Sequence, residues 1–377
     1  MRFTHLELEN WRNFLKVSVD LQQRVFVVGP NAAGKSNFLD VFRFLRDVAD
    51  PQNGFQRAAQ EIRRGVSQIR SLHARSRSNV VIDVSVDLEA EGDWRYRIGF
   101  TQAKNRSPVV AEEHVWRGNE KVLTRPDPDD HKDPERLTQT HLEQVNANKD
   151  FRALAQFFSR VQYLHVVPQL IREPDRSGGK ARDPFGGDFL EQLARTPEAT
   201  RKSRLRKIED ALRIAVPQLV NLRLERDERG AAHLEATYSH WRPKAGRQTE
   251  AEFSDGTLRL IGLLWVLLDN SAPLLLEEPE LSLHTAVVRQ IPRMMHRLGR
   301  KTGRQVLVST HSPELLQDEG ISPEEVLLLE ASDKDTKVRR AAELDEIKAL
   351  LAGGISMGEA VMPRTAPRDV QQLMLWQ

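Results

Sequence analysis

The feature that most constrains this chain is the segment 29–36, Gly-Pro-Asn-Ala-Ala-Gly-Lys-Ser. It fits the phosphate-loop pattern G-x-x-x-x-G-K-[ST], whose glycines let backbone N–H groups converge on a polyphosphate. A strand-like run at 24–28 precedes the loop, and apolar residues at helical spacing follow it from Phe38 to Val48. Strand, loop and helix in this order predict an α/β domain that binds nucleotide at the N-terminus of the helix.

Each position of the loop has an expected role. Gly29 and Gly34 permit the turn, Lys35 is expected to reach the β and γ phosphates, and the Ser36 hydroxyl is expected to bind Mg²⁺. ATP and Mg²⁺ are therefore the expected cofactors. The expected nucleotide contacts come from Gly29, Pro30, Asn31, Ala32, Ala33, Gly34, Lys35, Ser36 and Asn37.

A second candidate element is the apolar run 273–276, which ends in two adjacent carboxylates, Glu277 and Glu278. Ligands of parallel sheets bind at the carboxyl ends of the strands. We expect Glu277 to hold Mg²⁺, directly or through water, and Glu278 to polarise the attacking water. Alone, the pattern suits a strand followed by a solvated acidic turn equally well. The phosphate loop upstream favours the catalytic interpretation.

Two further motifs lie in the C-terminal third. His311 follows an apolar strand at 305–309 and is expected to contact a γ-phosphate or the attacking water, although a lone histidine is more often structural. Ser254, Asp255 and Gly256 open a helix predicted at about 257–269, where backbone N–H groups can bind an anion. The same turn could be a plain N-cap. One chain needs only one phosphate loop, so a second anion-binding turn suggests contact with the nucleotide of another molecule.

In this order, the four motifs resemble the ABC-type ATPase heads of the RecF, SMC and OLD group. The resemblance is specific over about 1–50 and 250–330. It implies a homodimer that sandwiches two ATP molecules, each contacted by Ser254 and Gly256 of the opposite subunit. The matching segments are 6–14 for the first strand and turn, 29–36 for Walker A, 253–257 for the signature, 274–278 for Walker B, 279–283 for the D-loop and His311 for the switch histidine.

This sequence departs from the usual pattern of the group at two places. The signature is Ser-Asp-Gly-Thr instead of Ser-Gly-Gly-Gln, which is similar to stand-alone ATPases near OLD and RecF. Glu277 stands where Walker B usually has an aspartate, one methylene shorter, while Glu278 keeps the place of the catalytic carboxylate. Gln169 is a candidate for the Q-loop glutamine, and a structural role suits it at least as well.

The expected fold class is α/β, a P-loop NTPase of the ABC-head type with a mixed β-rich and helical insertion. Residues 1–50 and 250–377 are expected to form the nucleotide-binding core, and 51–250 the inserted strands and helical lobe. The remaining expectations are strands at 3–9, 80–88, 94–101, 109–117, 219–226, 231–239 and 325–329, helices at 140–160, 186–196, 200–216 and 283–299, and polar loops at 126–134, 173–184 and 240–250.

Composition excludes several chemistries. The chain has no cysteine, so disulfides, thiolate metal sites and a cysteine nucleophile are excluded. Lys and Arg number 56 against 54 Asp and Glu, which argues against a surface coated in basic residues. The longest apolar run, 258–268, contains Arg259 and is too short to span a bilayer, and the first residues lack the apolar core of a signal peptide. A cytoplasmic protein with no membrane partner is expected.

Two basic clusters are candidates for contact with DNA phosphates, one at 57–77 and one at 201–207. No groove-reading motif accompanies them, and the second can equally be the solvated face of a helix. These two clusters therefore leave DNA as a possible partner.

The favoured function is an ATP-driven switch in DNA repair or antiphage defence that acts on DNA or on a separate effector. One alternative is the ATPase subunit of a membrane transporter, which the signature departure and the insertion of about 200 residues oppose. Another is a self-contained nuclease. OLD-like nucleases add a Toprim domain after the head, whereas only about 50 residues follow Leu329 here. That tail contains Glu343, Asp345 and Glu346 without a parallel-sheet pattern, so any nuclease is expected to be a separate chain.

Overall fold

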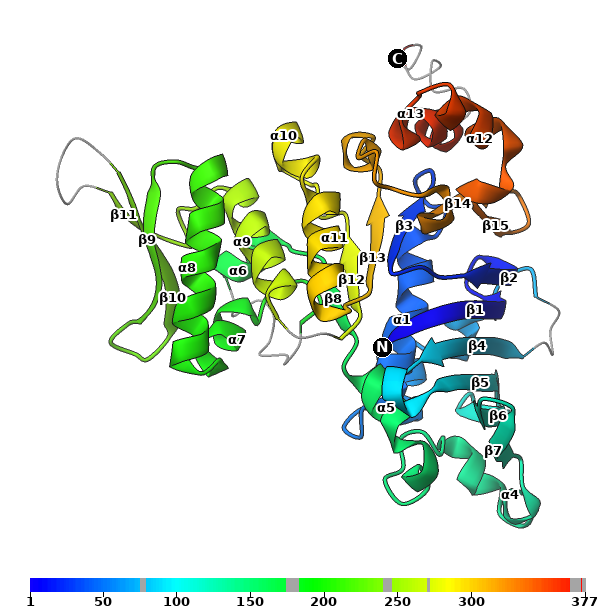
Figure 1. Ribbon diagram of the computed structural model, residues 1–377. Helices are drawn as coiled ribbons and strands as arrows, with labels where there is room; N and C mark the ends of the chain where they lie inside the picture. Colours follow the sequence, from blue (N-terminus) through cyan, green and yellow to red (C-terminus); the bar gives the residue numbers. More distant parts are fainter. Residues whose placement is uncertain (75–78, 174–182, 240–245, 270–271, 367–373, 375–377) are drawn as a thin grey trace. The chain divides into compact units, whose positions relative to one another are not determined.

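The computed structural model describes residues 1–74, 79–173, 183–239, 246–269, 272–366 and 374 (Figure 1). The chain folds as two compact units. The first comprises residues 1–162, 271–275 and 296–377, and the second comprises residues 163–270 and 276–295. The division predicted from sequence, at residues 50 and 250, separates the segments expected to bind nucleotide from the inserted segment. That division stays a prediction.

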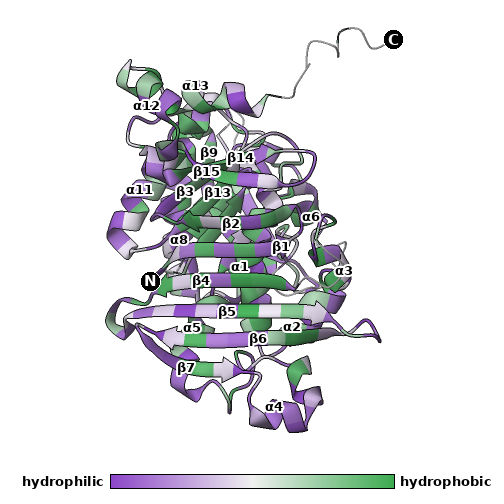
Figure 2. Ribbon diagram, turned by 90° about the vertical axis from the view of Figure 1, so that its right-hand side faces the viewer, coloured by the Kyte–Doolittle hydropathy of each residue, from purple (hydrophilic) through white to green (hydrophobic). Residues whose placement is uncertain are grey.

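An antiparallel sheet dominates the first unit, with strands in the order β2-β1-β4-β5-β6-β7. Its side chains alternate between a buried face and a polar face (Figure 2), as the two-residue period of a strand requires. On β5, for example, Trp94 and Tyr96 are buried while Arg95 between them is exposed. The strands are β1 Arg2–Trp11, β2 Phe14–Asp20, β4 Val80–Asp87, β5 Asp93–Gln102, β6 Pro108–Arg117 and β7 Glu120–Arg125.

The helix α1, Lys35–Ala49, packs its aromatic residues against the buried face of this sheet. Phe42 lies 4.7 Å from Phe3, and Phe44 lies 5.4 Å from Trp11, measured between ring centroids. The helix α5, Arg152–Ser159, adds Phe157 beside Phe3. This aromatic core holds α1 against the sheet. The phosphate loop leads directly into α1, so its position is fixed as well.

The second sheet contains the strands whose carboxyl ends carry the predicted motifs, in the order β15-β14-β3-β13-β12-β8. Strand β3 pairs in parallel with β13 and with β14, and Val28 is level with Thr310 and Leu328. Strand β15 pairs antiparallel with β14. The short apolar strands predicted from sequence are thus confirmed. Their bounds are β3 Arg24–Val28, β8 Gln162–Leu164, β12 Leu274–Glu277, β13 Val306–Thr310, β14 Val326–Ala331 and β15 Thr336–Arg340.

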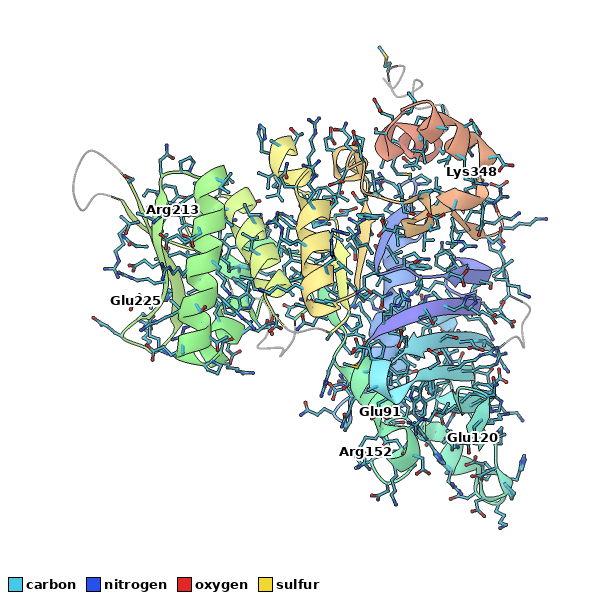
Figure 3. The ribbon with its side chains drawn as sticks, viewed as in Figure 1. Glu91, Glu120, Arg152, Arg213, Glu225 and Lys348 are labelled. Carbon is cyan, nitrogen blue, oxygen red and sulfur yellow. The ribbon has the colours of Figure 1, made fainter. Side chains whose placement is uncertain are left out.

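The second unit packs helices on a small antiparallel sheet in the order β11-β10-β9. Leu205, Ile208 and Leu212 on α8 are buried in its core, whereas Arg213 on α8 and Glu225 on β9 are exposed (Figure 3). The elements are α6 Pro168–Arg172, α7 Phe189–Arg195, α8 Glu198–Ala215, β9 Leu219–Arg226, β10 Ala232–Tyr238, β11 Arg247–Thr249, α9 Asp255–Leu267, α10 Thr285–Val288 and the start of α11 Ile291–Thr302.

Short helices complete the chain. They are α2 Gly54–Gln56, the π-helix η1 Arg57–Glu61, α3 Val66–Ile69, α4 Pro128–Lys132, α12 Asp345–Ala352 and α13 Met357–Val361. The 3₁₀ turns are η2 Glu89–Glu91, η3 Pro134–Thr138, η4 Lys149–Phe151, η6 Glu314–Leu316, η7 Pro323–Glu325, η8 Ala341–Glu343 and η9 Met362–Thr365. Within the described residues, no helix combines the length and apolar character needed to cross a bilayer.

Some local predictions are wrong. The loop predicted at 126–134 contains α4, because the Asp127 carboxylate accepts from the N–H of Asp130 while Asp130 accepts from the N–H of Asp127, a capping box. The helix predicted at 140–160 is reduced to α5, and the one predicted at 283–299 is interrupted between α10 and α11. The linker predicted at 240–250 includes β11. Residues 174–182 and 240–245 of the predicted loops lie outside the described residues.

Candidate functional site

The phosphate loop adopts the backbone that its sequence demands. Ala32 and Gly34 have φ values of 62° and 95°, in the left-handed region. Gly34 is the N-cap of α1, so no side chain caps this helix, and no acidic residue lies in its first turn. The uncapped N–H groups and the helix dipole favour an anion here. Gly29 is buried at the other end, where a Cβ atom would lie 2.8 Å from the carbonyl oxygen of Leu329.

The structure brings Lys35 and His311 together, although 276 positions separate them in sequence. The Lys35 side chain is buried, and its Nζ donates to the carbonyl oxygens of Gly29 and Pro30 at 3.0 and 3.1 Å. Nζ also lies 3.4 Å from Nδ1 of His311. Val28 and Thr310 are paired at the ends of the parallel strands β3 and β13, so the residues that follow the two strands lie close together. Donation to Nδ1 leaves the proton of a neutral imidazole on Nε2.

Asn13, in the turn between β1 and β2, was missed as a site residue. Its Nδ2 donates to the carbonyl oxygen of Ala33 in the loop and to Oγ1 of Thr336, both at 2.8 Å. Its Oδ1 accepts from Nδ2 of Asn37 at 2.7 Å. One side chain thus ties the loop to β15 and to α1. The signal was present in sequence, because the turn Asn-Trp-Arg-Asn-Phe was part of the resemblance. Within the loop, Asn31, Ala32 and Ser36 are exposed at the surface.

The acid pair lies in the second unit. The Tyr163 hydroxyl donates to Oε2 of Glu277, and Nδ1 of His165 donates to the Glu277 carbonyl oxygen at 3.2 Å. Glu278 has a φ of 45°, in the left-handed region. A non-glycine residue held there costs about 1–3 kcal/mol, and such strain clusters at functional sites. Tyr163 and His165 are two further positions that the sequence interpretation did not single out.

Arg259, on α9, lines a small pocket with the acid pair. Its Nε is buried and has no hydrogen-bond partner, and burial lowers the pKa of its guanidinium while Asp255, Glu278 and Glu280 act in the opposite direction. The residues that line this pocket are Leu164, Val166, Arg259, Leu263, Leu276, Glu277, Glu278 and Pro279.

The signature turn is a well-formed N-cap of α9. The exposed Ser254 accepts from the N–H of Thr257 through Oγ at 3.2 Å. The Asp255 carboxylate accepts from Arg172 at 2.7 Å. A Cβ atom at Gly256 would lie 2.6 Å from the carbonyl oxygen of Ser282, so the turn requires glycine. Both interpretations of the turn, N-cap and anion site, remain compatible with this geometry. Gln169 is exposed on α6.

A protein-family model described as "AAA domain, putative AbiEii toxin, Type IV TA system" matches residues 24–317. The match spans well over half of the chain, from the strand before the phosphate loop to the residues beyond His311. The chain belongs to this family. It is an ATPase domain of the ABC type found in SMC, RecF and OLD proteins, as the resemblance predicted.

Known proteins are similar over different extents. A curated relative, Endonuclease GajA of Bacillus cereus, is 38% identical over 58 residues, which cover 15% of this chain and 10% of that protein, so the chain spans only a tenth of the relative's length. The Smc head domain of Pyrococcus furiosus with an extended coiled coil, bound to the C-terminal domain of ScpA, has a TM-score of 0.52 and 13% identity. The superposition covers 93% of this chain and 99% of that chain, and it confirms the SMC-head fold.

In this ATPase domain, several arginines of the two basic clusters pair with acidic residues. Arg63 is buried by Asp40 and Asp47, and Arg57 pairs with Glu61. Arg204 pairs with Asp269 at 3.0 Å and stacks on Trp265. The prediction that these arginines contact DNA is therefore wrong for Arg63, whose side chain is 2% exposed. Arg75 and Arg77 lie outside the described residues.

Proposed function

We propose that this chain binds and hydrolyses ATP, and that two copies close around two ATP molecules to act as a nucleotide-dependent switch. The observation that carries the proposal is the phosphate loop, in which an uncapped α1 and a buried Lys35 beside His311 leave a preorganised anion site. Membership of the family supports nucleotide binding. Hydrolysis and dimer formation go beyond nucleotide binding, and the experiments below test them.

Each part of the site has a proposed role. The loop amides and Lys35 would bind the phosphates, Glu278 would take the proton of the attacking water, and His311 would orient the reacting phosphate. Ser36 and Glu277 offer oxygen ligands, the type that Mg²⁺ prefers, and the Tyr163 hydrogen bond fixes the Glu277 carboxylate. Bound Mg²⁺ would neutralise phosphate charge.

The signature turn supports the dimer. Ser254 is exposed at the N-terminus of α9, the end of a helix that favours an anion, and the turn requires glycine at position 256. We propose that this anion is the nucleotide of the opposite protomer. The switch would then report the nucleotide to DNA or to a separate effector protein.

We further propose a role in antiphage defence or DNA repair. The local identity with an endonuclease supports this role, although it covers a small part of both proteins. The tail acids considered for an intrinsic nuclease form ion pairs, Glu343 with Arg340, Asp345 with Lys348 and Glu346 with Arg364. This pairing favours an effector over nuclease chemistry by those three residues.

Complementation between two inactive variants tests the composite site. Lys35→Ala removes the phosphate-binding cation, and Ser254→Arg places a bulky side chain on the exposed signature turn. In a mixed dimer, one site combines both defects and the other has an intact loop facing an intact turn. Random mixing in equal amounts should therefore restore about a quarter of the wild-type ATPase rate, because half of the dimers carry one working site of two.

The control is Ser254→Asn, which keeps an N-cap and should retain most activity. If the mixture stays inactive while each variant remains folded, the two motifs do not serve the same nucleotide across a dimer. If Lys35→Ala alone hydrolyses ATP at the wild-type rate, the loop is not the hydrolytic site.

A further inference from the structure

The signature turn carries an acid at the place where an anion is proposed to bind. Asp255 lies in the first turn of α9, and 41% of its side chain is exposed. An acid at this position favours the helix, because its charge interacts with the positive end of the helix dipole. The same charge repels a phosphate that approaches the N-terminus of α9. The phosphate loop avoids this conflict, since no acidic residue lies in the first turn of α1.

An arginine from another helix offsets the charge of Asp255. Arg172 is the last residue of α6, and its Nη2 donates to Oδ1 of Asp255 and to the carbonyl oxygen of Phe253, both at 2.7 Å. These two acceptors belong to the residues on either side of Ser254. Arg172 therefore holds the turn before and after the exposed serine, and it places a positive charge against the Asp255 carboxylate.

The backbone that carries Arg172 is fixed against α9. Ile171, its neighbour on α6, is 1% exposed and belongs to the same hydrophobic core as Phe253, Leu258 and Ile261. The Arg172 side chain itself is 21% exposed. The ion pair is thus partly buried and held in place by its surroundings, unlike an exposed pair between two mobile side chains.

The two proposed anion sites differ in the origin of their positive charge. The phosphate loop supplies its own cation, Lys35, whereas the signature segment 253–258 contains no lysine or arginine. The cation that is hydrogen-bonded to this segment is Arg172, which lies 83 positions before Asp255. The departure of the signature from Ser-Gly-Gly to Ser-Asp-Gly is therefore matched by a cation from a distant part of the sequence.

We propose that Arg172 is a positioning residue of the composite nucleotide site. It offsets the charge of Asp255, so that the signature turn binds the phosphates of the ATP held by the opposite protomer. This inference rests on the proposed function, because it needs the nucleotide sandwich. It adds to that function the residue on which phosphate binding by the turn depends. Arg172 acts through Asp255 and is assigned no contact with the nucleotide.

The test measures ATP-dependent dimer formation of the full chain in the Glu278→Gln background, which prevents hydrolysis. Sedimentation velocity at several protein concentrations, with ATP and Mg²⁺, gives the dissociation constant of the dimer. The parent is compared with Arg172→Gln, with Asp255→Asn and with the double variant. Glutamine suits a helix and removes the charge of Arg172, and asparagine keeps the shape of Asp255 without its charge.

Arg172→Gln leaves the charge of Asp255 uncompensated beside each bound phosphate. We expect the dissociation constant to rise about 100-fold, about tenfold for each of the two composite sites, because like charges opposed across an interface weaken binding strongly. Asp255→Asn alone should dimerise at least as tightly as the parent. The double variant should return to within about threefold of the parent, since no acid is then left to offset.

Arg204→Gln is the matched control for a purely structural role. Arg204 pairs with Asp269 at 3.0 Å, their side chains are 19% and 30% exposed, and Arg204 also stacks on Trp265 of α9. Thermal unfolding should show similar losses of stability in Arg172→Gln and Arg204→Gln, whereas Arg204→Gln should dimerise as the parent does. Equal weakening of the dimer by both variants would show that Arg172 acts through stability alone, which would overturn the proposal.

The remaining outcomes separate this inference from the proposed function. If Arg172→Gln dimerises with ATP as tightly as the parent, the inference fails while the nucleotide sandwich stands. If the double variant is as weak as Arg172→Gln, Asp255 is not the charge that matters, and the offset is refuted. A parent chain that stays monomeric with ATP contradicts the proposed function, and the role of Arg172 fails with it.

Discussion

Arg63 binds two acids on α1, the helix that follows the phosphate loop, and replacing Arg63 tests whether it anchors that helix. This side chain is 2% exposed and donates to both carboxylate oxygens of Asp40 and to Oδ2 of Asp47, at 2.8–3.0 Å. Both acids lie on α1, whose N-terminus carries the loop. Replacement by methionine, Arg63→Met, keeps most of the volume and removes the charge.

The expected cost is about 3 kcal/mol of folding free energy. Removing one partner of a buried ion pair costs about 3–5 kcal/mol, because it leaves the other charge buried and uncompensated. The lower end applies here, since Asp40 keeps Arg12 at 2.9 Å and Asp47 keeps Arg46 at 2.7 Å. With an m-value near 3 kcal/mol/M, the urea midpoint should fall by about 1 M.

The effect should depend on pH in a defined direction. Burial opposes ionisation of Asp40, but its ion pair and hydrogen bonds with Arg63, together with Arg43 and Arg12, hold its pKa well below the ordinary value. A lowered pKa contributes stability above the unfolded pKa and loses it as pH falls. The gap between wild type and Arg63→Met should therefore be largest near pH 7 and shrink below about pH 4.

The adjacent Arg64 supplies the matched control, because it is exposed. Arg64→Met removes the same charge and should change stability by less than about 0.5 kcal/mol. Adding Asp40→Asn and Asp47→Asn to Arg63→Met should restore part of the loss, since no buried carboxylate is then left without the Arg63 guanidinium. Equal urea midpoints for Arg63→Met and Arg64→Met would refute the assignment of Arg63 as a buried anchor of α1.

Three further predictions concern the site. Arg259→Leu should lower the ATPase rate about tenfold, because it removes the cation that lines one pocket with Glu277 and Glu278; an unchanged rate contradicts this. Asn13→Ala should weaken ATP binding about tenfold by isothermal titration, through loss of its hydrogen bond to Ala33, while wild-type affinity would show that the loop needs no such tether. Gly29→Ala should abolish ATP binding because its Cβ would meet the Leu329 carbonyl oxygen, and retained binding would mean that the loop can shift.

Local sequence was sufficient for the elements whose signal is local. The phosphate loop, its strand and α1 are contiguous, and the apolar strands β12, β13 and β14 are short and uniform. Capping at 127–130 is also a local signal, but the prolines and aspartates there favour a loop in sequence, although the same residue types also begin helices. The proline at the first helical position of α4 and the capping box between Asp127 and Asp130 favour a helix there.

The features that could not be predicted depend on partners distant in sequence. Arg63 resembled its exposed neighbour Arg64 until the fold placed Asp40 and Asp47 around it. Lys35 and His311 were each assigned a role, but only the register of β3 and β13 brings them within 3.4 Å. Arg259 was seen only as an interruption of an apolar run, because its relation to Glu278 requires the fold.

The central claim is that ATP closes a dimer which Glu278 opens by hydrolysis. Sedimentation velocity of Glu278→Gln with ATP and Mg²⁺ tests it most directly, with the Lys35→Ala, Glu278→Gln double variant as the control. A stable dimer is predicted for the single variant with ATP and a monomer for the double variant. A monomeric Glu278→Gln chain that nevertheless binds ATP would contradict the claim.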